Sequence, residues 1–152
     1  MSRIVYNDFD GEDFGFAEGR WLAHMKSACM GRPGQKVFGE LEAVLAAMPD
    51  KRLIEGSLTN PDGEVCALGA LARNRGMDLS AVFAETDEEV QMWAARELGL
   101  TETLAWVIME ENDEELETAT LERRHAAMLA WVQGWQRAPA RMFAEYKSSH
   151  LP

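Results

Sequence analysis

Cys66 and His125 are the residues of this sequence whose side chains are best suited to covalent chemistry. Cys66 lies in Asp-Gly-Glu-Val-Cys-Ala-Leu-Gly-Ala, between a predicted strand and a predicted helix. A helix N-terminus lowers the pKa of a thiol and an imidazole can take its proton, so Cys66 with His24 or His125 as the base is one candidate catalytic arrangement. Asn112 or Asp113 could orient that base. The sequence does not show that these residues meet in space.

The neighbours of Cys66 favour a packing role instead. The segment Ala67–Leu71 is small and apolar, and Gly69 and Ala70 permit another backbone to approach closely. The only other cysteine is Cys29, and two isolated thiols in a reducing compartment are usually free and buried. We therefore expect Cys66 to be a buried structural thiol and the protein to be non-enzymatic.

Metal and cofactor sites are not indicated. The two cysteines and three histidines have neither CxxC nor HxxxH spacing. The run from Asp8 to Asp13 invites comparison with a calcium loop, but Asp13 stands where that loop has glycine and Gly19 where it has its bidentate glutamate. The glycines of 31–36 lack the spacing of a phosphate-binding loop. We predict no bound metal and no cofactor.

Charge narrows the choice of partner. The 152 residues include 26 acidic and 15 basic side chains, which gives a net charge of −11. Phosphate backbones and anionic membranes attract clustered Lys and Arg, so direct nucleic-acid binding and membrane binding are disfavoured. No apolar run is long enough to span a bilayer, and 1–13 does not read as a secretion signal. We expect a cytoplasmic protein whose partner is a protein with a basic surface.

The acidic residues are clustered. One cluster is 85–89, with Glu88 and Glu89, and the densest places six acids in eight positions: Glu110, Glu111, Asp113, Glu114, Glu115 and Glu117. One interpretation is a solubilising surface with acids at helix N-termini. The other is an acidic face for a basic protein, with Trp106 and Trp131, which lie off the main apolar stripes, as anchors.

Apolar periodicity predicts a mainly α fold. Helices are expected over 14–30, 37–48, 67–75, 86–98 and 101–108, and from Thr118 or Thr120 to about 138. Asn60-Pro-Asp-Gly63 is strong turn chemistry, and we predict a β-hairpin with strands 52–58 and 64–67 around it. The whole is a compact single domain of five to six helices, with 1–13 as an arm and 139–152 as a final helix or flexible tail.

Four segments together suggest a family. They are Arg52-Leu-Ile-Glu-Gly, Asp62–Leu71, Glu111-Asn-Asp-Glu114, and Glu122-Arg-Arg followed by Met128 and Trp131-Val132. Over about residues 35–135 the chain resembles a family of small uncharacterised proteins of phages, prophages and bacterial genomes. Those proteins also show Gly-x-Val-Cys-x-Leu-Gly-Ala, a later Asn-Asp, and a C-terminal helix with Arg and Trp. The resemblance implies no established activity, only a phage-related intracellular accessory role.

These observations lead to one expectation and two alternatives. The expectation is an acidic, helical, non-enzymatic protein that binds a macromolecular partner and modulates the host, for example in counter-defence. Its strong form is DNA mimicry, in which ordered carboxylates take the place of phosphates. The alternatives are a Cys66-dependent enzyme and a self-associating structural protein.

Overall fold

The computed structural model describes residues 14–82, 86–113 and 118–150, and these residues are mainly helical. Seven α-helices and one short 3₁₀ helix occur in those ranges: α1 (Phe14–Met30), α2 (Arg32–Ala47), α3 (Ala67–Asn74), η1 (Leu79–Ala81), α4 (Asp87–Leu98), α5 (Glu102–Asp113), α6 (Leu121–Arg137) and α7 (Pro139–His150). The mainly α prediction is confirmed, and the predicted number of five to six helices is too low. The predicted arm 1–13 and the calcium-loop comparison at Asp8–Asp13 lie outside the described residues.

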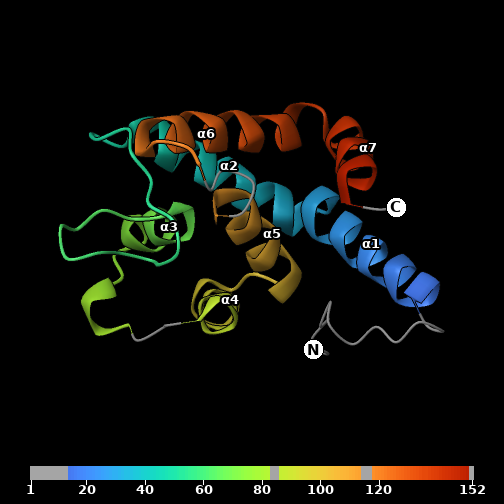
Figure 1. Ribbon diagram of the computed structural model, residues 1–152, viewed down its shortest axis with the longest axis horizontal. Helices are drawn as coiled ribbons and strands as arrows, with labels where there is room; N and C mark the ends of the chain where they lie inside the picture. Colours follow the sequence, from blue (N-terminus) through green and yellow to red (C-terminus); the bar gives the residue numbers. More distant parts are fainter. Residues whose placement is uncertain (1–13, 83–85, 114–117, 151–152) are drawn as a thin grey trace.

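Helix α2 is the centre of the molecule. Its Phe38, Leu41 and Leu45 are fully buried, which fits the continuous apolar stripe read from the sequence. Helix α6 runs along one side of α2, α1 and α3 pack against other parts of it, and α5 packs against α1 and α3 (Figure 1). In this arrangement the end of α5 lies near α6 and α7, and residues from these three helices line one pocket.

The corner between α1 and α2 is tighter than the sequence suggested. The predicted helices over 14–30 and 37–48 leave 31–36 between them, but the actual connection is a single non-helical residue, Gly31. Pro33 lies in the first turn of α2, where a missing N–H costs nothing. Gly34 is required because a Cβ there would overlap the carbonyl oxygen of Ala28 in α1.

Caps define both ends of α4 and the start of α5. The backbone N–H of Glu89 donates to Thr86 Oγ1 at 3.1 Å, and the Thr86 hydroxyl donates to Glu89 Oε1 at 3.1 Å. Gly99 ends α4 in the left-handed conformation, and Thr101 Oγ1 accepts from the backbone N–H of Leu104 at 3.0 Å. The acidic N-terminus of α4 is therefore held rigidly.

The predicted β-hairpin is wrong. Within the described residues of the 48–66 loop, only an isolated antiparallel bridge joins Thr59 to Val65, although the backbone N–H of Gly63 does donate to Asn60 O at the predicted turn. A few further backbone bonds join the two arms, from the Ile54 N–H to Val65 O and from the Cys66 N–H to Leu58 O, but they do not form a regular ladder, and the N–H of Leu53 donates to Leu121 O in α6 instead. Gly56 has φ of 79°, which reverses the chain where a strand would continue.

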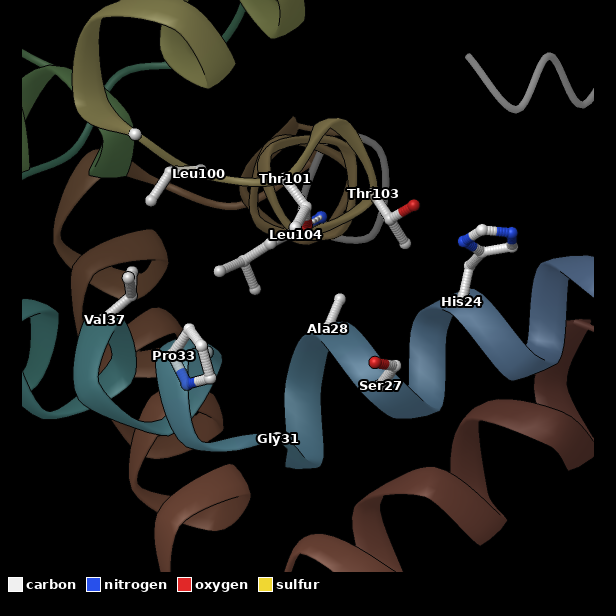
Figure 2. Close-up of a pocket in the computed structure, with 12 residues that line it drawn as sticks. His24, Ser27, Ala28, Gly31, Pro33, Val37, Leu100, Thr101, Thr103 and Leu104 are labelled. Atoms are coloured by element: carbon white, nitrogen blue, oxygen red, sulfur yellow. Dashed lines mark hydrogen bonds between the residues drawn. The ribbon is translucent and has the colours of Figure 1, made fainter. Parts of the chain in front are cut away.

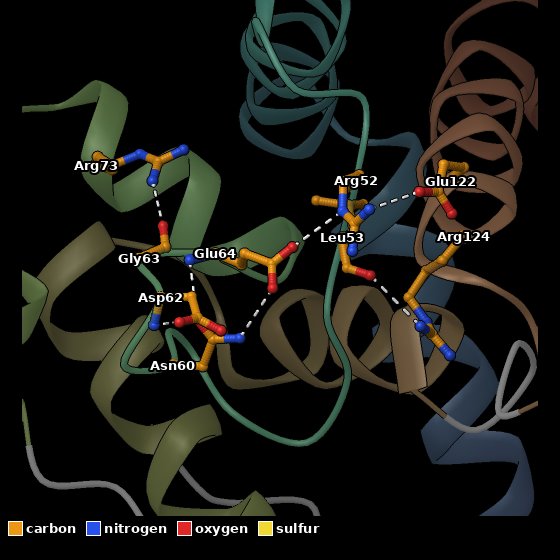
Figure 3. A network of polar contacts seen from close by, with 9 residues as sticks. All are labelled: Arg52, Leu53, Asn60, Asp62, Gly63, Glu64, Arg73, Glu122 and Arg124. Carbon is orange, nitrogen blue, oxygen red and sulfur yellow. Dashed lines mark hydrogen bonds and ion pairs between the residues drawn. The ribbon is translucent and has the colours of Figure 1, made fainter.

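Side chains clamp this loop to the helices (Figure 3). Arg52 Nε donates to Glu64 Oε2 at 3.0 Å, and Arg52 Nη1 donates to Glu122 Oε1 on α6 at 2.8 Å. Arg73 on α3 donates to the Gly63 carbonyl at 2.8 Å. A loop with few ladder bonds is thus fixed by charged contacts to two helices.

The segment left open as a final helix or flexible tail is helical over 139–150. α6 ends at Arg137, as Pro139 predicted, and Pro139 itself begins α7. Helix α7 lies across the end of α6 beside α1 (Figure 1), and Trp21 Nε1 donates to Tyr146 Oη at 2.9 Å. None of the helices in the described ranges is long and apolar enough to cross a membrane.

Candidate functional site

The segment around Cys66 contains a buried polar junction, which we define as Asn112, Arg124 and the backbone they bind at 53–54 and 67. Asn112 is 1% exposed; its Oδ1 accepts from the backbone N–H of Ala67 at 3.1 Å, and its Nδ2 donates to Ile54 O at 2.9 Å. One side chain thus joins the end of α5 to the start of α3 and to the loop. These bonds satisfy the Ala67 N–H and the Ile54 carbonyl, which would be unfavourable to bury without hydrogen-bond partners.

Arg124 completes the polar junction from α6. It is 1% exposed, and its guanidinium donates to Asn112 O at 2.9 Å and to Leu53 O at 3.4 Å. Glu55, which is half exposed, forms an ion pair with it at 3.5 Å and so offsets the buried charge. These partners belong to the protein itself, and the polar junction is a structural element.

Cys66 lies beside this junction as the N-cap of α3. Its Sγ accepts from the backbone N–H of Gly69 at 3.4 Å, and the residue is 7% exposed. Burial raises the pKa of the Cys66 thiol to about 12, and the nearby carboxylate of Asp113 adds to that effect. The expected buried thiol is confirmed, and the thiolate that a nucleophile needs is suppressed.

The histidines are not arranged as bases for Cys66. His125 is 4% exposed, and its Nε2 donates to Leu45 O at 2.7 Å, which is a structural bond between α6 and α2. His24 is exposed on α1. No contact found in the described part of the chain joins either ring to Cys66. The enzyme alternative therefore lacks its assembled pair of nucleophile and base.

A groove of about 360 Å³ opens between α1, α2 and the start of α5. In Figure 2, Ala28, Val37 and Leu104 lie around an apolar centre, and His24 stands at one end near Thr103. His24 is the one titratable side chain among the residues that line it. The groove has room for a small, partly apolar group. It does not offer the two titratable groups of general acid–base catalysis.

The acidic residues singled out in the sequence separate into different surroundings. Glu88 and Glu89 are exposed on the first turn of α4, whereas Glu110, Glu111 and Asp113 are half-buried at the end of α5. Glu114, Glu115 and Glu117 lie outside the described residues. The run 110–117 therefore does not form one uniform exposed face.

Asp113 belongs to a group of acids from distant segments, which we call the acidic cluster: Glu55, Asp87 and Asp113. Burial raises the pKa of the Asp113 carboxyl, and the negative charges of Asp87 and Glu55 raise it further. Hydrogen bonds from Asn112 and from the backbone of Gly56 act in the opposite direction. The loop, the start of α4 and the end of α5 thus bring negative charge together.

The two tryptophans proposed as anchors are both half-buried, and they differ in their neighbours. Trp106 packs against the core from α5. Trp131 lines a pocket of about 160 Å³ between α5, α6 and α7, which we call the aromatic pocket; its walls are Glu111, Trp131, Trp135, Met142, Glu145, Tyr146 and Ser149. The structure therefore places Glu111 and Trp131 in one pocket, two residues that the sequence analysis assigned to the same proposed binding face.

Several residues of these sites were not predicted from the sequence, among them Arg124, Glu145 and Tyr146. Arg124 lies in an ordinary Glu-Arg-Arg stretch, and Glu145 and Tyr146 lie in the segment left open as a helix or tail. A usable signal was available for Tyr146, since Tyr146, Met142 and Phe143 give 139–150 an apolar stripe at helical spacing. Arg124 had no comparable signal, because its burial depends on loop carbonyls distant in sequence.

The described ranges contain no group of three or more His, Cys, Asp or Glu residues that could hold a metal ion. No protein-family model matches the chain, and neither curated proteins nor solved structures provide a match. The phage-type resemblance thus stays a prediction.

Proposed function

We propose that the protein is an acidic, non-enzymatic binding protein whose partner is a macromolecule with a basic surface. The observation that supports this most directly is the acidic cluster. Glu55, Asp87 and Asp113 come from three segments far apart in sequence, yet the charges of Glu55 and Asp87 both act on the half-buried Asp113. Like charges brought together in a partly desolvated place are unfavourable, and a cation supplied by a partner relieves that repulsion.

Local structure fixes the positions of Asp87 and Asp113 in the acidic cluster. Asp87 starts α4 directly after the Thr86 cap, and Asp113 accepts from Asn112 Nδ2 at 2.7 Å. Glu88 and Glu89 extend the negative surface along the first turn of α4. Fixed charges of one sign increase the rate at which an oppositely charged protein associates, and this effect weakens as salt screens them.

The setting we propose is a cytoplasmic accessory protein of phage type that modulates a host protein. A basic host target, such as a nucleic-acid-binding defence or transcription component, matches the net charge of −11. In the DNA-mimic form of this proposal, the carboxylates occupy the phosphate sites of that target. Self-association remains the competing explanation for a binding surface, and light scattering across protein concentration separates the two.

The test compares two charge-matched variants. Partners are first captured from bacterial lysate and identified, and the association rate of the purified partner is then measured at low and high salt. We expect Asp87→Asn/Asp113→Asn to slow association about tenfold at low salt. Asp50→Asn/Asp62→Asn, which removes the same charge from exposed positions in the 48–66 loop, serves as the control and should change the rate less than twofold.

The outcomes are distinct. A rate that falls with salt and responds to the acidic cluster alone supports the proposal. If the two double variants slow association equally, net charge alone explains the effect and the acidic cluster has no special role, which contradicts the proposal. An association rate that does not change with salt contradicts the proposal directly.

A further inference from the structure

The aromatic pocket has an unusual combination of walls. Trp131, Trp135 and Tyr146 supply aromatic surface, Met142 a thioether, and Glu111 and Glu145 supply carboxylates. None of the residues that line it is basic. Aromatic faces carry negative electrostatic potential, so rings and carboxylates here favour the same sign of ligand.

The walls are positioned before any ligand arrives. Trp131 and Trp135 lie nearly perpendicular, at 83° with ring centroids 6.3 Å apart. Phe38 supports both rings from α2, edge-on to Trp131 at 5.6 Å and stacked on Trp135 at 6.0 Å. Tyr146 is held by the hydrogen bond from Trp21 Nε1. Binding to such rigid walls loses little conformational entropy.

Two carboxylates from different helices line the pocket. Glu145 forms an ion pair with Arg141 one turn earlier on α7, with Arg141 Nε 3.7 Å from Glu145 Oε1. Because both side chains are largely exposed, this ion pair is weak and can be exchanged for another. Glu111 is half-buried at the end of α5 and lines the same pocket. A cation in the pocket therefore lies among carboxylates contributed by α5 and by α7.

We propose that the aromatic pocket receives the guanidinium of an arginine side chain from the partner protein. A planar guanidinium stacks on indole and phenol rings and donates to carboxylates, and it is weakly hydrated compared with an ammonium. The volume of about 160 Å³ admits one side chain of this size. This inference rests on the proposed function, which supplies a partner with a basic surface, and it names the group that anchors it.

Other ligand classes fit the walls less well. A phosphate or carboxylate would be repelled by Glu111 and Glu145. A neutral apolar group would remove water from both carboxylates without replacing the lost hydrogen bonds. The combination of rings and carboxylates therefore discriminates by charge as well as by shape.

The direct test uses a small probe, N-acetyl-arginine amide, titrated into the full chain to tens of millimolar. The indole N–H resonances of the five tryptophans are followed by NMR after assignment by single Trp→Phe variants. We expect saturable shifts at Trp131 and Trp135, with Trp93 and Trp106 unaffected. N-acetyl-citrulline amide has the same shape without the charge, and it should bind at least about fivefold more weakly.

Two adjacent glutamates provide matched variants. Glu111→Gln should weaken binding of the arginine probe at least about threefold, whereas Glu110→Gln, with the same change in charge one position earlier on α5, should not. Equal binding of the citrulline probe, equal effects of the two variants, or no saturable shift at Trp131 would overturn the inference.

Failure of this inference is distinguishable from failure of the proposed function. If a partner associates with the expected dependence on salt and on the acidic cluster, but neither the arginine probe nor Glu111→Gln has an effect, the pocket assignment alone is wrong. If the arginine probe binds as expected and no protein partner shows that dependence, the aromatic pocket is a cation site and the proposed function is wrong.

Discussion

Glu111 and Asn112 are neighbours in the chain, and they serve two different regions of the molecule. Glu111 lines the aromatic pocket, and Asn112 is the centre of the polar junction. Successive residues of a helix point about 100° apart, so one polar run at the end of α5 is divided between a surface and an interior. A run of like residues is therefore weak grounds for predicting a single face.

The two regions also use polarity differently. In the polar junction, Asn112 and Arg124 bind backbone groups of the protein, so their contribution is to stability. In the aromatic pocket, carboxylates stand beside rigid rings at a place open to a ligand. If this contrast is correct, substitutions in the junction change the free energy of unfolding and substitutions in the pocket change binding.

The largest effect is expected for the thiol beside the polar junction. Burial raises the pKa of Cys66 from 9.0 to about 12, which lowers its thiolate fraction about a thousandfold at neutral pH. We expect Cys66 and Cys29, whose pKa is also raised to about 12 by burial, to react with a disulfide reagent only after unfolding. Timed thiol titration with and without denaturant measures this. Rapid reaction of one native thiol, traced to Cys66 by peptide mapping, would revive the enzyme alternative.

The next effect is on stability. Asn112→Ala leaves the Ala67 N–H and the Ile54 carbonyl buried without their partner, and we expect the free energy of unfolding to fall by about 3 kcal/mol. Urea denaturation followed by circular dichroism provides the measurement. Glu111→Gln, its neighbour on the pocket side, keeps a hydrogen-bonding side chain of the same shape at a half-buried position and should lower stability by less than about 1 kcal/mol. Similar losses for both would show that the two regions are not functionally separate.

A pair of glycines sharpens the contrast. A Cβ at Gly69 would overlap the backbone carbonyl of Leu58, whereas a Cβ at Gly134 would meet the flexible end of Met142, with Sδ at 2.7 Å. We expect Gly69→Ala to cost about 2–3 kcal/mol and Gly134→Ala less than about 1 kcal/mol, because a methionine can change rotamer and a backbone cannot. Thermal unfolding of the two variants provides the comparison, and the reverse order would contradict it.

The smallest effect concerns pH. The pKa of Asp113 is raised in the folded protein, so the folded state holds its proton more tightly than the unfolded state. Stability from this group is present below its ordinary pKa and is lost as pH rises through the folded value. Because Asp113 is only half-buried, we expect Asp113→Asn to raise stability at pH 7 by less than about 1 kcal/mol, with the difference vanishing in acid. Urea titrations at several pH values test the sign.

Local rules predicted much of the helical framework. The helices expected over 86–98 and from Thr118 or Thr120 are present as α4 and α6, and the caps and apolar stripes that define them depend on residues within a few positions of one another. The close approach expected at Gly69 is also present. Because apolar periodicity and helix capping involve residues close together in the chain, both signals can be recognised in a single sequence.

Contacts between segments that are distant in sequence were not predictable from such local patterns. The 52–67 segment has strand-like residues and a strong turn, but only scattered backbone bonds join its two arms, and other backbone groups of the segment bond to Leu121 and Asn112. The aromatic pocket likewise depends on Tyr146 reaching Trp21, 125 positions away. Such contacts are set by the packing of whole helices, which no local pattern reports.

The hydrogen bond between Trp21 and Tyr146 also determines when the aromatic pocket forms during folding of the chain. One wall of the aromatic pocket belongs to α7, which is synthesised after the six helices before it, while the residue that fixes this wall is in α1. Closing so long a loop is entropically costly until the intervening helices have packed. The aromatic pocket is therefore completed late in folding, and a nascent chain that still lacks α7 has its charged surface before it has its anchor site.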